Sequence, residues 1–398
     1  MNLGLWLFVL AVMLIVGTLL NLKWLVFFVT TVGFLLAITH LWRKHSLDQV
    51  QYRRKWIYTR GFPGETADVQ LEVENRKRLP VSWLKAVDNW PVAAPPVERD
   101  LLSPSHLVER GFLTNIFSLR GFQRAHRTYR FRFDQRGIHP IGPVRLESGD
   151  LFGLFEEAQT LEPADQLTVF PEVLPLESLR LPAEDPFGDR QAPRRLFEDP
   201  NRTIGVRGYH PEDEMRRIHW PATARTGSMQ VRLYQPVSAR VLMVCLNVST
   251  SEHIWQGTAS APLEQIVKIA ATICYHGMED GYSVGLISNG GLARSDRAFK
   301  ILPSRSPNHL ALLLQALAGV SPITIAPFEN YLLKTMPDVP LGATLLVVTP
   351  LVTTALAETL VALRRYRAHT TLISIAPEPP PEIPGVRSIH LPFEEAVG

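Results

Sequence analysis

The stretch 241-VLMVCL-246 sets how the second half of the chain folds. Six consecutive apolar residues are too few for a typical helix, and the absence of polar alternation indicates a strand buried on both faces. The next elements support this interpretation, because residues 263–278 place apolar side chains at helical spacing and residues 282–287 resemble another strand. A buried strand, an amphipathic helix and a second strand predict a parallel sheet covered by helices.

The alternation continues to the end of the chain. Helices are predicted at 307–318 and 355–366, and strands at 345–348 and 371–375. Residues 239–398 are therefore predicted to form an α/β, doubly wound domain with a proline-rich, extended tail after Pro377.

The chain that precedes this domain, residues 181–238, is predicted to combine a linker with an unusual arginine- and aromatic-rich segment. Prolines and glycines between 180 and 205 favour irregular chain. The segment 205–234 that follows is too polar for a core and too aromatic for a plain linker. It contains five arginines and three aromatic residues: Arg207, Arg216, Arg217, Arg225, Arg232, Tyr209, Trp220 and Tyr234.

Residues 45–180 predict an all-β, sandwich-like module. The runs 68-DVQLEV-73 and 129-YRFRF-133 alternate polar and apolar residues, which is the period of a half-buried antiparallel strand. Turn signals at 136–137, 141–143 and 148–150 separate such runs, and no long amphipathic helix interrupts them. A sandwich of short strands is the fold that this pattern favours.

Residues 1–44 predict a transmembrane helical hairpin. No charged residue occurs from position 1 to 22, and after Lys23 the run 24–39 is again uncharged. A helix needs roughly 20 residues to cross the hydrocarbon core, and both segments are long enough. A cleaved signal peptide is the alternative, but no basic residue precedes the first segment and no small-residue cleavage pattern follows it.

The distribution of basic residues predicts the orientation of this hairpin. Arg43, Lys44 and residues 53–55 follow the second span, whereas only Lys23 lies between the spans. The positive-inside rule then places the bulk of the chain in the cytoplasm, as a multi-pass protein of the cell membrane. The only two cysteines, Cys245 and Cys274, form no disulfide framework and are interpreted as small buried residues in a reducing compartment.

Charge and motifs argue against several classes of function. The 41 basic and 38 acidic residues leave a net charge of +3, which does not suggest a nucleic-acid-coating protein. No zinc-protease, phosphate-binding-loop or dinucleotide-binding motif occurs. The sequence 281-GYSVG-285 matches a hydrolase elbow in letters, but it leads from a helix into a strand rather than the reverse. We therefore expect neither enzymatic activity nor a nucleic-acid partner.

A spaced set of motifs resembles the signature of the bacterial family named domain of unknown function 58. The set comprises 207-RGY-209, 213-DEMRRIHW-220, 223-TAR-225 and 231-VRLY-234. Upstream, the dipeptide 136-RG-137 and the runs 150-DLFGLF-155 and 169-VFP-171 resemble the strand-end signatures of that family. The resemblance therefore extends over the whole chain, including the two N-terminal helices.

This resemblance implies a C-terminal domain similar to von Willebrand factor type A, in which an Asp-x-Ser-x-Ser loop can bind a divalent cation such as Mg²⁺. The corresponding residues here are 247-NVSTS-251, so Asn247, Ser249 and Ser251 are candidate ligands of a degenerate site. Asn247 replaces the carboxylate, residues 303–306 lie where a second loop is expected, and the third loop, 349–351, lacks an Asp. We expect a structural loop without a cofactor. A divalent-cation-dependent receptor is the alternative function.

The signature residues have two open interpretations, structural or partner-binding: Arg207, Tyr209, Asp213, Arg216, His219, Trp220, Arg225 and Tyr234. In the structural one, Asp213 or Glu214 accepts hydrogen bonds from arginines, His219 is a hydrogen-bonded structural residue, and Trp220 and Tyr234 pack between the two modules. The burial of Arg207, Arg216, Trp220 and Arg225 distinguishes the two, because an exposed cluster favours docking.

The resemblance also implies a partner. Family members commonly occur beside MoxR-type AAA+ ATPases, in systems thought to assemble or chaperone protein complexes. We therefore expect a non-enzymatic, membrane-anchored scaffold whose partners are the lipid bilayer and a MoxR-type AAA+ ATPase.

Overall fold

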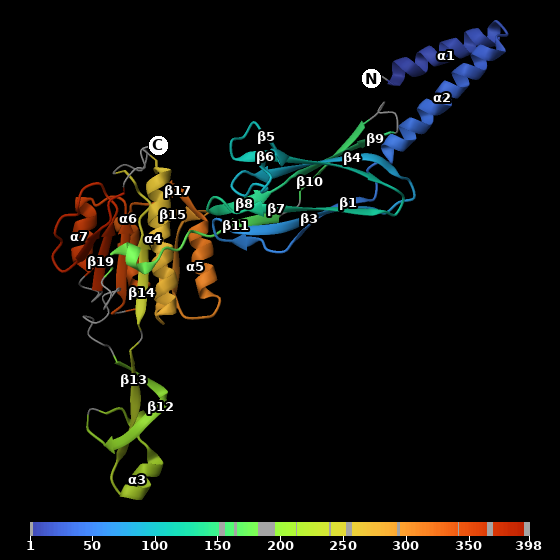
Figure 1. Ribbon diagram of the computed structural model, residues 1–398. Helices are drawn as coiled ribbons and strands as arrows, with labels where there is room; N and C mark the ends of the chain where they lie inside the picture. The colour runs from blue at the N-terminus through green and yellow to red at the C-terminus, as the bar shows by residue number, and fades with distance from the viewer. Residues whose placement is uncertain are drawn as a thin grey trace. The chain divides into compact units, whose positions relative to one another are not determined.

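A computed structural model of the chain describes residues 3–150, 156–162, 165–181, 196–211, 213–238, 240–251, 257–292, 295–340, 342–363 and 369–393. The chain forms two compact units, Met1–Phe170 and Pro171–Gly398 (Figure 1). Most of the predicted linker, residues 182–195, lies outside the described residues.

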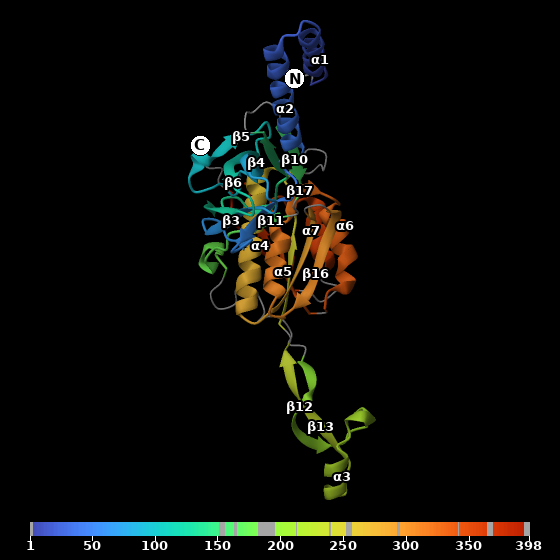
Figure 2. The same ribbon diagram turned by 90° about the vertical axis from the view of Figure 1, so that its right-hand side faces the viewer.

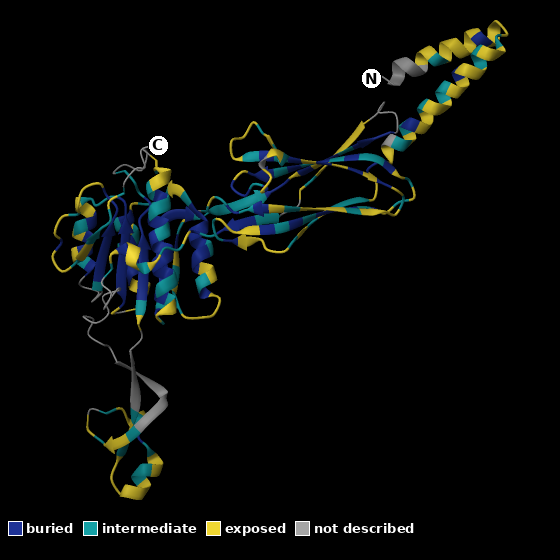
Figure 3. Ribbon diagram, in the orientation of Figure 1, coloured by how far each residue is buried: buried dark blue, intermediate teal, exposed yellow. Residues whose placement is uncertain are grey.

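Unit 1 begins with two apolar helices, α1 (Leu3–Leu19) and α2 (Lys23–Lys44), joined by a turn at which Asn21 has a positive φ of 56°. Among the described residues, Lys23–Trp42 is the one helix long and apolar enough to cross a bilayer, and α1 is a shorter apolar helix. Most of the ribbon of the two helices has the colour of exposed residues in Figure 3. Phe27 is 74% exposed and Leu19 is 79% exposed. Such exposed apolar surface requires a nonaqueous surrounding or a partner.

The rest of unit 1 is a set of short strands, antiparallel apart from the pairing of β2 with β11. One sheet has the order β1-β3-β7, a second β10-β9-β4-β6-β5, and a third β2-β11-β8. Their bounds are β1 (Val50–Trp56), β2 (Arg60–Gly61), β3 (Thr66–Asn75), β4 (Val81–Pro91), β5 (Leu102–Pro104), β6 (Arg110–Leu119), β7 (Arg124–Arg132), β8 (Gly137–Ile141), β9 (Val144–Gly149), β10 (Glu156–Leu161) and β11 (Asp165–Val169). A 3-10 helix, Arg99–Leu101, precedes β5.

Alternation of side chains along β3 shows why these sequences fold as strands. Val69, Leu71 and Val73 are fully buried, and the first two share a core with Trp90 of β4 and Phe131 of β7. The first and second sheets thus pack face to face through apolar side chains. The strands predicted over residues 68–73 and 129–133 are confirmed.

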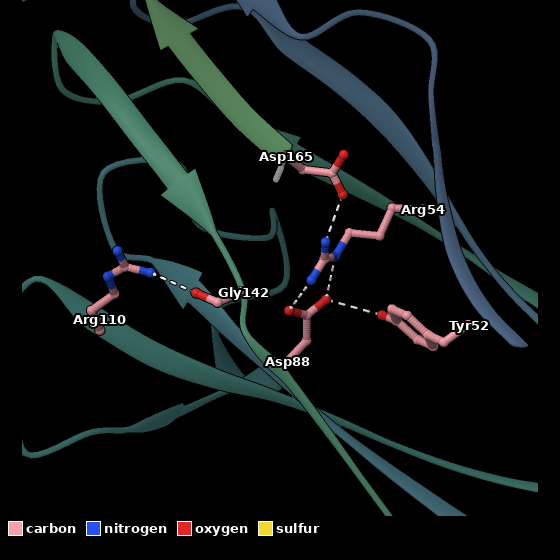
Figure 4. Close-up of polar contacts among 6 residues, drawn as sticks. All are labelled: Tyr52, Arg54, Asp88, Arg110, Gly142 and Asp165. Carbon is pink, nitrogen blue, oxygen red and sulfur yellow. Dashed lines mark hydrogen bonds and ion pairs between the residues drawn. The ribbon is translucent and has the colours of Figure 1, made fainter. Parts of the chain in front are cut away.

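A buried ionic network connects three strands of unit 1 (Figure 4). Arg54 of β1 donates two hydrogen bonds of 2.7 Å to the carboxylate of Asp88 on β4 and one of 2.6 Å to Asp165 of β11. The Tyr52 hydroxyl donates to Asp88 at 2.9 Å. Although burial alone would lower it, these carboxylates raise the pKa of Arg54. Asp88 therefore accepts three hydrogen bonds, which helps a charge to remain buried.

Unit 2 contains a mixed sheet with the order β16-β15-β14-β18-β19-β20. The strands β14 (Val241–Leu246), β15 (Ser283–Leu292), β18 (Thr344–Thr349), β19 (His369–Ser374) and β20 (Arg387–His390) are parallel, whereas β16 (Ser295–Ser304) and β17 (Val320–Thr324) run antiparallel to β15. Its helices are α4 (Ser260–Glu279), α5 (His309–Ala318), α6 (Phe328–Thr335) and α7 (Thr354–Ala362), with 3-10 turns at Leu176–Leu179 and Met336–Asp338.

Helices cover both faces of this sheet (Figures 1 and 2). Met243 and Cys245 of β14 share a core with Leu332 of α6 and Leu356 of α7. Helix α4 packs on the opposite face of β14. The two elements are so close that a Cβ atom on Gly277 of α4 would lie 2.8 Å from a methyl group of Leu242. Burial on both faces explains why 241-VLMVCL-246 lacks polar alternation.

The predicted α/β elements of unit 2 are present, although residues 364–366 of the last predicted helix lie outside the described residues. The predicted parallel sheet needs correction, because only five of its strands are parallel and two run antiparallel to β15. The sequence pattern also did not predict β16, β17, α6 or β20. The polar residues of β16 and the short lengths of β17 and β20 weaken their periodic signal. Both cysteines are free and buried, and burial raises the pKa of Cys274 to about 12.

The buried network makes a testable prediction for unit 1. In the variant Asp88→Asn, the guanidinium of Arg54 loses a fully buried carboxylate, so the free energy of unfolding is expected to fall by about 3–5 kcal/mol. Urea unfolding of the detergent-solubilised chain measures this change. The matched control is Asp68→Asn, which breaks the exposed pair with Arg130 and is expected to leave the midpoint nearly unchanged. Equal effects of the two variants would contradict the role assigned to Asp88.

Candidate functional site

Two features of unit 2 contain the residues that the sequence analysis selected. The first is a two-stranded ribbon formed by β12 (Leu196–Gly208) and β13 (Gln230–Ser238), with a 3-10 turn (Met215–Arg217) and the helix α3 (Trp220–Thr226) between them. We call residues 196–238 the signature ribbon. The sequence analysis did not predict these strands. Ile218 pairs with Val231, and both side chains are buried.

Arg207 and Asp213 form a two-pronged charge pair in the signature ribbon. Two guanidinium nitrogens of Arg207 donate to the two carboxylate oxygens of Asp213, at 2.7 and 2.6 Å, and the backbone N–H of His210 donates to the same carboxylate at 2.8 Å. The hydrogen bonds from Arg207, followed by that from His210, lower the pKa of Asp213 to about 2. The pair closes the turn that follows β12.

His219 begins the helix α3 as its N-cap. The ring Nδ1 of His219 accepts a hydrogen bond of 3.0 Å from the backbone N–H of Ala222. The backbone N–H of His219 donates to the backbone carbonyl oxygen of Gln230 at 2.7 Å. The first bond caps α3, and the second ties the start of α3 to β13. His219 therefore holds a structural position in the signature ribbon.

The remaining signature residues face outward. Trp220 is 62% exposed, Met215 is 63% exposed, and the Arg216 side chain, paired with Glu214, is 82% exposed. Arg207 and Arg225 are exposed as well, whereas Tyr209 is half-buried. The signature ribbon itself does not cover Trp220, because a short two-stranded ribbon offers too little surface to cover a large ring. The side chain of Tyr234 lies outside the described residues.

The second feature is a pocket of about 110 Å³ at the carboxyl edge of the sheet. We call it the strand-end pocket. In the sheet, β14 lies between β15, the next strand in the chain, and β18. The chain therefore leaves β14 and β18 in opposite directions, and the loops after these two strands diverge at the carboxyl edge. Such switch points form crevices in parallel sheets. The pocket is lined by Asn247, Ser249, Ser251, Pro327, Phe328, Glu329, Leu351 and Thr353.

The three candidate metal ligands are thus brought to one pocket, where amide groups engage the oxygens of Asn247 and Ser249, and the hydroxyl of Ser251 donates to the carbonyl oxygen of Gly257 at 3.2 Å. Asn289, fully buried on β15, donates from Nδ2 to Asn247 Oδ1 and to Ser249 Oγ, each at 3.1 Å. Asn247 Oδ1 also accepts from the backbone N–H of Ser249 at 3.1 Å. A carbonyl oxygen has two lone pairs, so Asn247 Oδ1 is saturated without a cation.

The other two loops do not provide the ligands of a cation site either. Thr349 Oγ1 accepts from the Asn247 amide at 3.0 Å, so this third loop supplies a hydrogen-bond acceptor. The expected second loop, 303–306, is at the opposite edge, because the antiparallel β16 places Ser304 beside Val284 near the start of β15. Thr324 is instead the residue near Ser249, with 3.4 Å between the hydroxyl oxygens. Within the described residues no three His, Cys, Asp or Glu side chains gather, and this donor set does not fit a divalent cation.

The sequence analysis did not select two polar residues that line the pocket, Glu329 and Thr353, or Asn289, which bonds to its lining residues. Glu329 is in the first turn of α6, and Thr353 is the N-cap of α7, where its hydroxyl accepts from Leu356 N and donates to Glu329 Oε1 at 3.0 Å. Asn289 lies within a strand that the apolar pattern ended at residue 287. A Thr immediately before an apolar helical pattern is a capping signal that could have identified Thr353.

The fold and these features define a multi-domain, β-rich protein whose second unit carries an α/β sheet with a pocket at its carboxyl edge. Within that class, the family described as "Protein of unknown function DUF58" matches residues 205–395, which is just under half of the chain. The match supports this family for the signature ribbon and the α/β sheet. Of the upstream residues that carry the resemblance, 151–155 lie outside the described residues.

The relatives found are distant. An uncharacterized protein YeaD of Bacillus subtilis is 21% identical over 248 residues, which are 62% of this chain and 57% of YeaD. Among solved structures, the CARDB domain of a Pyrococcus furiosus protein is 11% identical with a TM-score of 0.20, over 30% of this chain and 91% of that domain. The sporulation control protein Spo0M of Bacillus subtilis is 10% identical with a TM-score of 0.19, over 33% of this chain and 53% of its own. Scores this low carry no functional argument.

The pairing of Arg207 with Asp213 makes a prediction about pH. The lowered pKa means that the pair stabilises the ribbon above the ordinary value of 3.8 and stops doing so as the pH falls through about 2. In Arg207→Gln, the pKa of Asp213 is expected to rise toward 3.8, short of it because His210 N–H still donates. Carbon-13 NMR of labelled aspartate carboxyl groups measures it, with Asp213→Asn identifying the signal. An unchanged pKa would show that Arg207 does not control Asp213.

The engagement of the loop oxygens predicts the response to metal ions. Millimolar Mg²⁺ is expected to leave the melting temperature of the wild-type chain unchanged. The variant Asn289→Asp replaces the amide donor with a buried carboxylate, so it is expected to melt lower without Mg²⁺ and to recover partly with it. Thermal unfolding in Mg²⁺, with Asn308→Asp as a control outside the pocket, tests this. A rise in the melting temperature of the wild type on adding Mg²⁺ would show that the pocket does bind a cation.

Proposed function

We propose that this protein is a membrane-anchored, non-enzymatic scaffold that holds a protein partner at the cytoplasmic face of the cell membrane. The observation that carries the proposal is the exposed signature ribbon. Trp220 and Met215 are both exposed, and large apolar side chains that gather on a protein surface often mark the binding site of a partner. Trp and Arg are also among the residues that most often dominate the binding energy of protein interfaces. A two-stranded ribbon is also marginally stable by itself, so a partner would stabilise it.

The anchor in this proposal is a hairpin of two spans formed by α1 and α2. The length and composition of Lys23–Trp42 support one span, and the uncharged sequence of α1 supports the other. Seventeen residues at about 1.5 Å each extend about 25 Å, so α1 would cross with its first residues included or with local thinning of the bilayer. The basic residues after α2 favour a cytoplasmic location of both units.

The α/β sheet of unit 2 would belong to the von Willebrand factor A-like class. Support comes from the position of its polar loop, Asn247 to Ser251, which follows the first strand of the sheet at a switch point. This class commonly binds other proteins through that edge. In this chain such binding would not require a metal ion, because Asn289 engages the loop oxygens.

The partner we propose is a MoxR-type AAA+ ATPase, which the resemblance to the DUF58 family implies. Charge supports a partner with an acidic surface, since Arg225 and Arg232 are exposed on α3 and β13. Trp220, at the start of α3, would enter an apolar pocket of that surface. The scaffold would then hold the ATPase near its substrate complexes.

The experiment that tests this proposal measures binding of the detergent-solubilised chain to the purified ATPase from the same cell. In Trp220→Ala, the loss of an interface tryptophan is expected to cost about 2 kcal/mol, or about 30-fold in Kd. The double variant Arg225→Glu and Arg232→Glu is expected to raise Kd as well. The increase is expected to be larger at low salt than at high salt, because salt screens the interaction between exposed charges.

The control is Leu312→Ala, which removes an equally exposed apolar side chain from α5, 51% exposed in the wild type. It is expected to bind as the wild type does. If the ATPase does not bind, that partner is wrong. If it binds all variants equally, the docking surface lies elsewhere.

A further inference from the structure

Glu329 gives the strand-end pocket a negative charge that none of its other lining residues neutralises. The eight lining residues include no Lys, Arg or His. Among the described residues, the one hydrogen bond of Glu329 comes from Thr353 to Oε1, which leaves Oε2 for a ligand. Thr353 is itself fixed by capping α7, so the carboxylate is held in place by a rigid neighbour.

The polarity of the pocket selects a cation of organic type. An anion would meet Glu329, which already occupies the electropositive amino end of α6. A divalent metal ion would need several oxygens, but Asn247 Oδ1 is saturated and Ser249 Oγ already accepts from Asn289. An ammonium group is different, because it donates three hydrogen bonds and needs only acceptors with one lone pair left.

Size and shape narrow the ligand further. The volume of about 110 Å³ is several times the ~30 Å³ that a water molecule occupies in the liquid, so the pocket has room for an ammonium group and part of its alkyl stem. Pro327, Phe328 and Leu351 provide an apolar wall for such a stem. The ammonium group of lysine is also more compact than the planar guanidinium of arginine, so a pocket of this volume favours lysine over arginine.

We propose that the strand-end pocket binds the lysine side chain of a protein partner, with the ammonium group on Glu329 and on the hydroxyl oxygens of Ser249 or Ser251, and without a metal ion. The pocket therefore has the opposite polarity from a metal site that receives an acidic side chain. This inference does not depend on the signature ribbon, so it stands or falls separately from the proposed function.

The test uses the full chain in detergent and three blocked tripeptides: acetyl-Gly-Lys-Gly-amide, its norleucine analogue without the ammonium group, and its arginine analogue. Saturation-transfer NMR titrations measure their binding. The lysine peptide is expected to bind at least about tenfold more tightly than the norleucine and arginine peptides, with no change on adding Mg²⁺ or a chelator. Equal binding of lysine and norleucine peptides, or binding that requires Mg²⁺, would overturn the proposal.

The variant Glu329→Gln keeps the shape of the side chain and removes its charge. It is expected to lose the preference for lysine over norleucine, while its melting temperature stays close to that of the wild type because Thr353 can still donate to the amide oxygen. Glu358→Gln, on the exposed face of α7, makes the same charge change outside the pocket and is expected to retain the preference. If Glu329→Gln retains it as well, the lysine binds elsewhere.

Discussion

The carboxyl edge of the α/β sheet depends on the hydrogen bonds made by the side-chain amide of Asn289. Asn289 is fully buried within β15; its side chain donates to Asn247 and Ser249 and accepts from the backbone N–H of Val248 at 2.9 Å. Asn247 passes the connection on to Thr349 of β18. Three neighbouring strands are thus joined by neutral hydrogen bonds that leave no buried polar atom of Asn247 or Asn289 without a partner. A loop of this kind is held in place by amides rather than by a metal ion.

Unit 1 solves a similar problem with charges. Arg54 and Asp88 are 1% and 0% exposed, and their burial is tolerable because each charged group meets several hydrogen-bonding partners. The network crosses between sheets, so it fixes how the layers register as well as how strongly they bind. The signature ribbon has no comparable core, since Ile218 and Val231 are the apolar side chains that it buries among its described residues. Its outward-facing Trp220 and arginines thus fit a role in binding a partner.

The sequence located the candidate residues of the pocket but not their chemistry. The family resemblance selected Asn247, Ser249 and Ser251, and the buried strand before them agrees with it, since a polar run after such a strand emerges at a sheet edge. Glu329, Thr353 and Asn289 lie 80, 104 and 40 residues from Ser249 in the chain and carry no motif. What they do depends on where α6, α7 and the end of β15 pack, and short helices with weak periodicity give little warning of that.

The sequence by itself determined the order of the parts: an apolar start, a region of short alternating strands, and an α/β region whose strands are buried on both faces. Local periodicity and burial suffice for this, because each element carries its own pattern. The tertiary structure decided the rest. The antiparallel direction of β16 removed residues 303–306 from the pocket, and the pairing of β12 with β13 left Trp220 exposed. Strand direction and partner are set by contacts between distant residues, which no local pattern records.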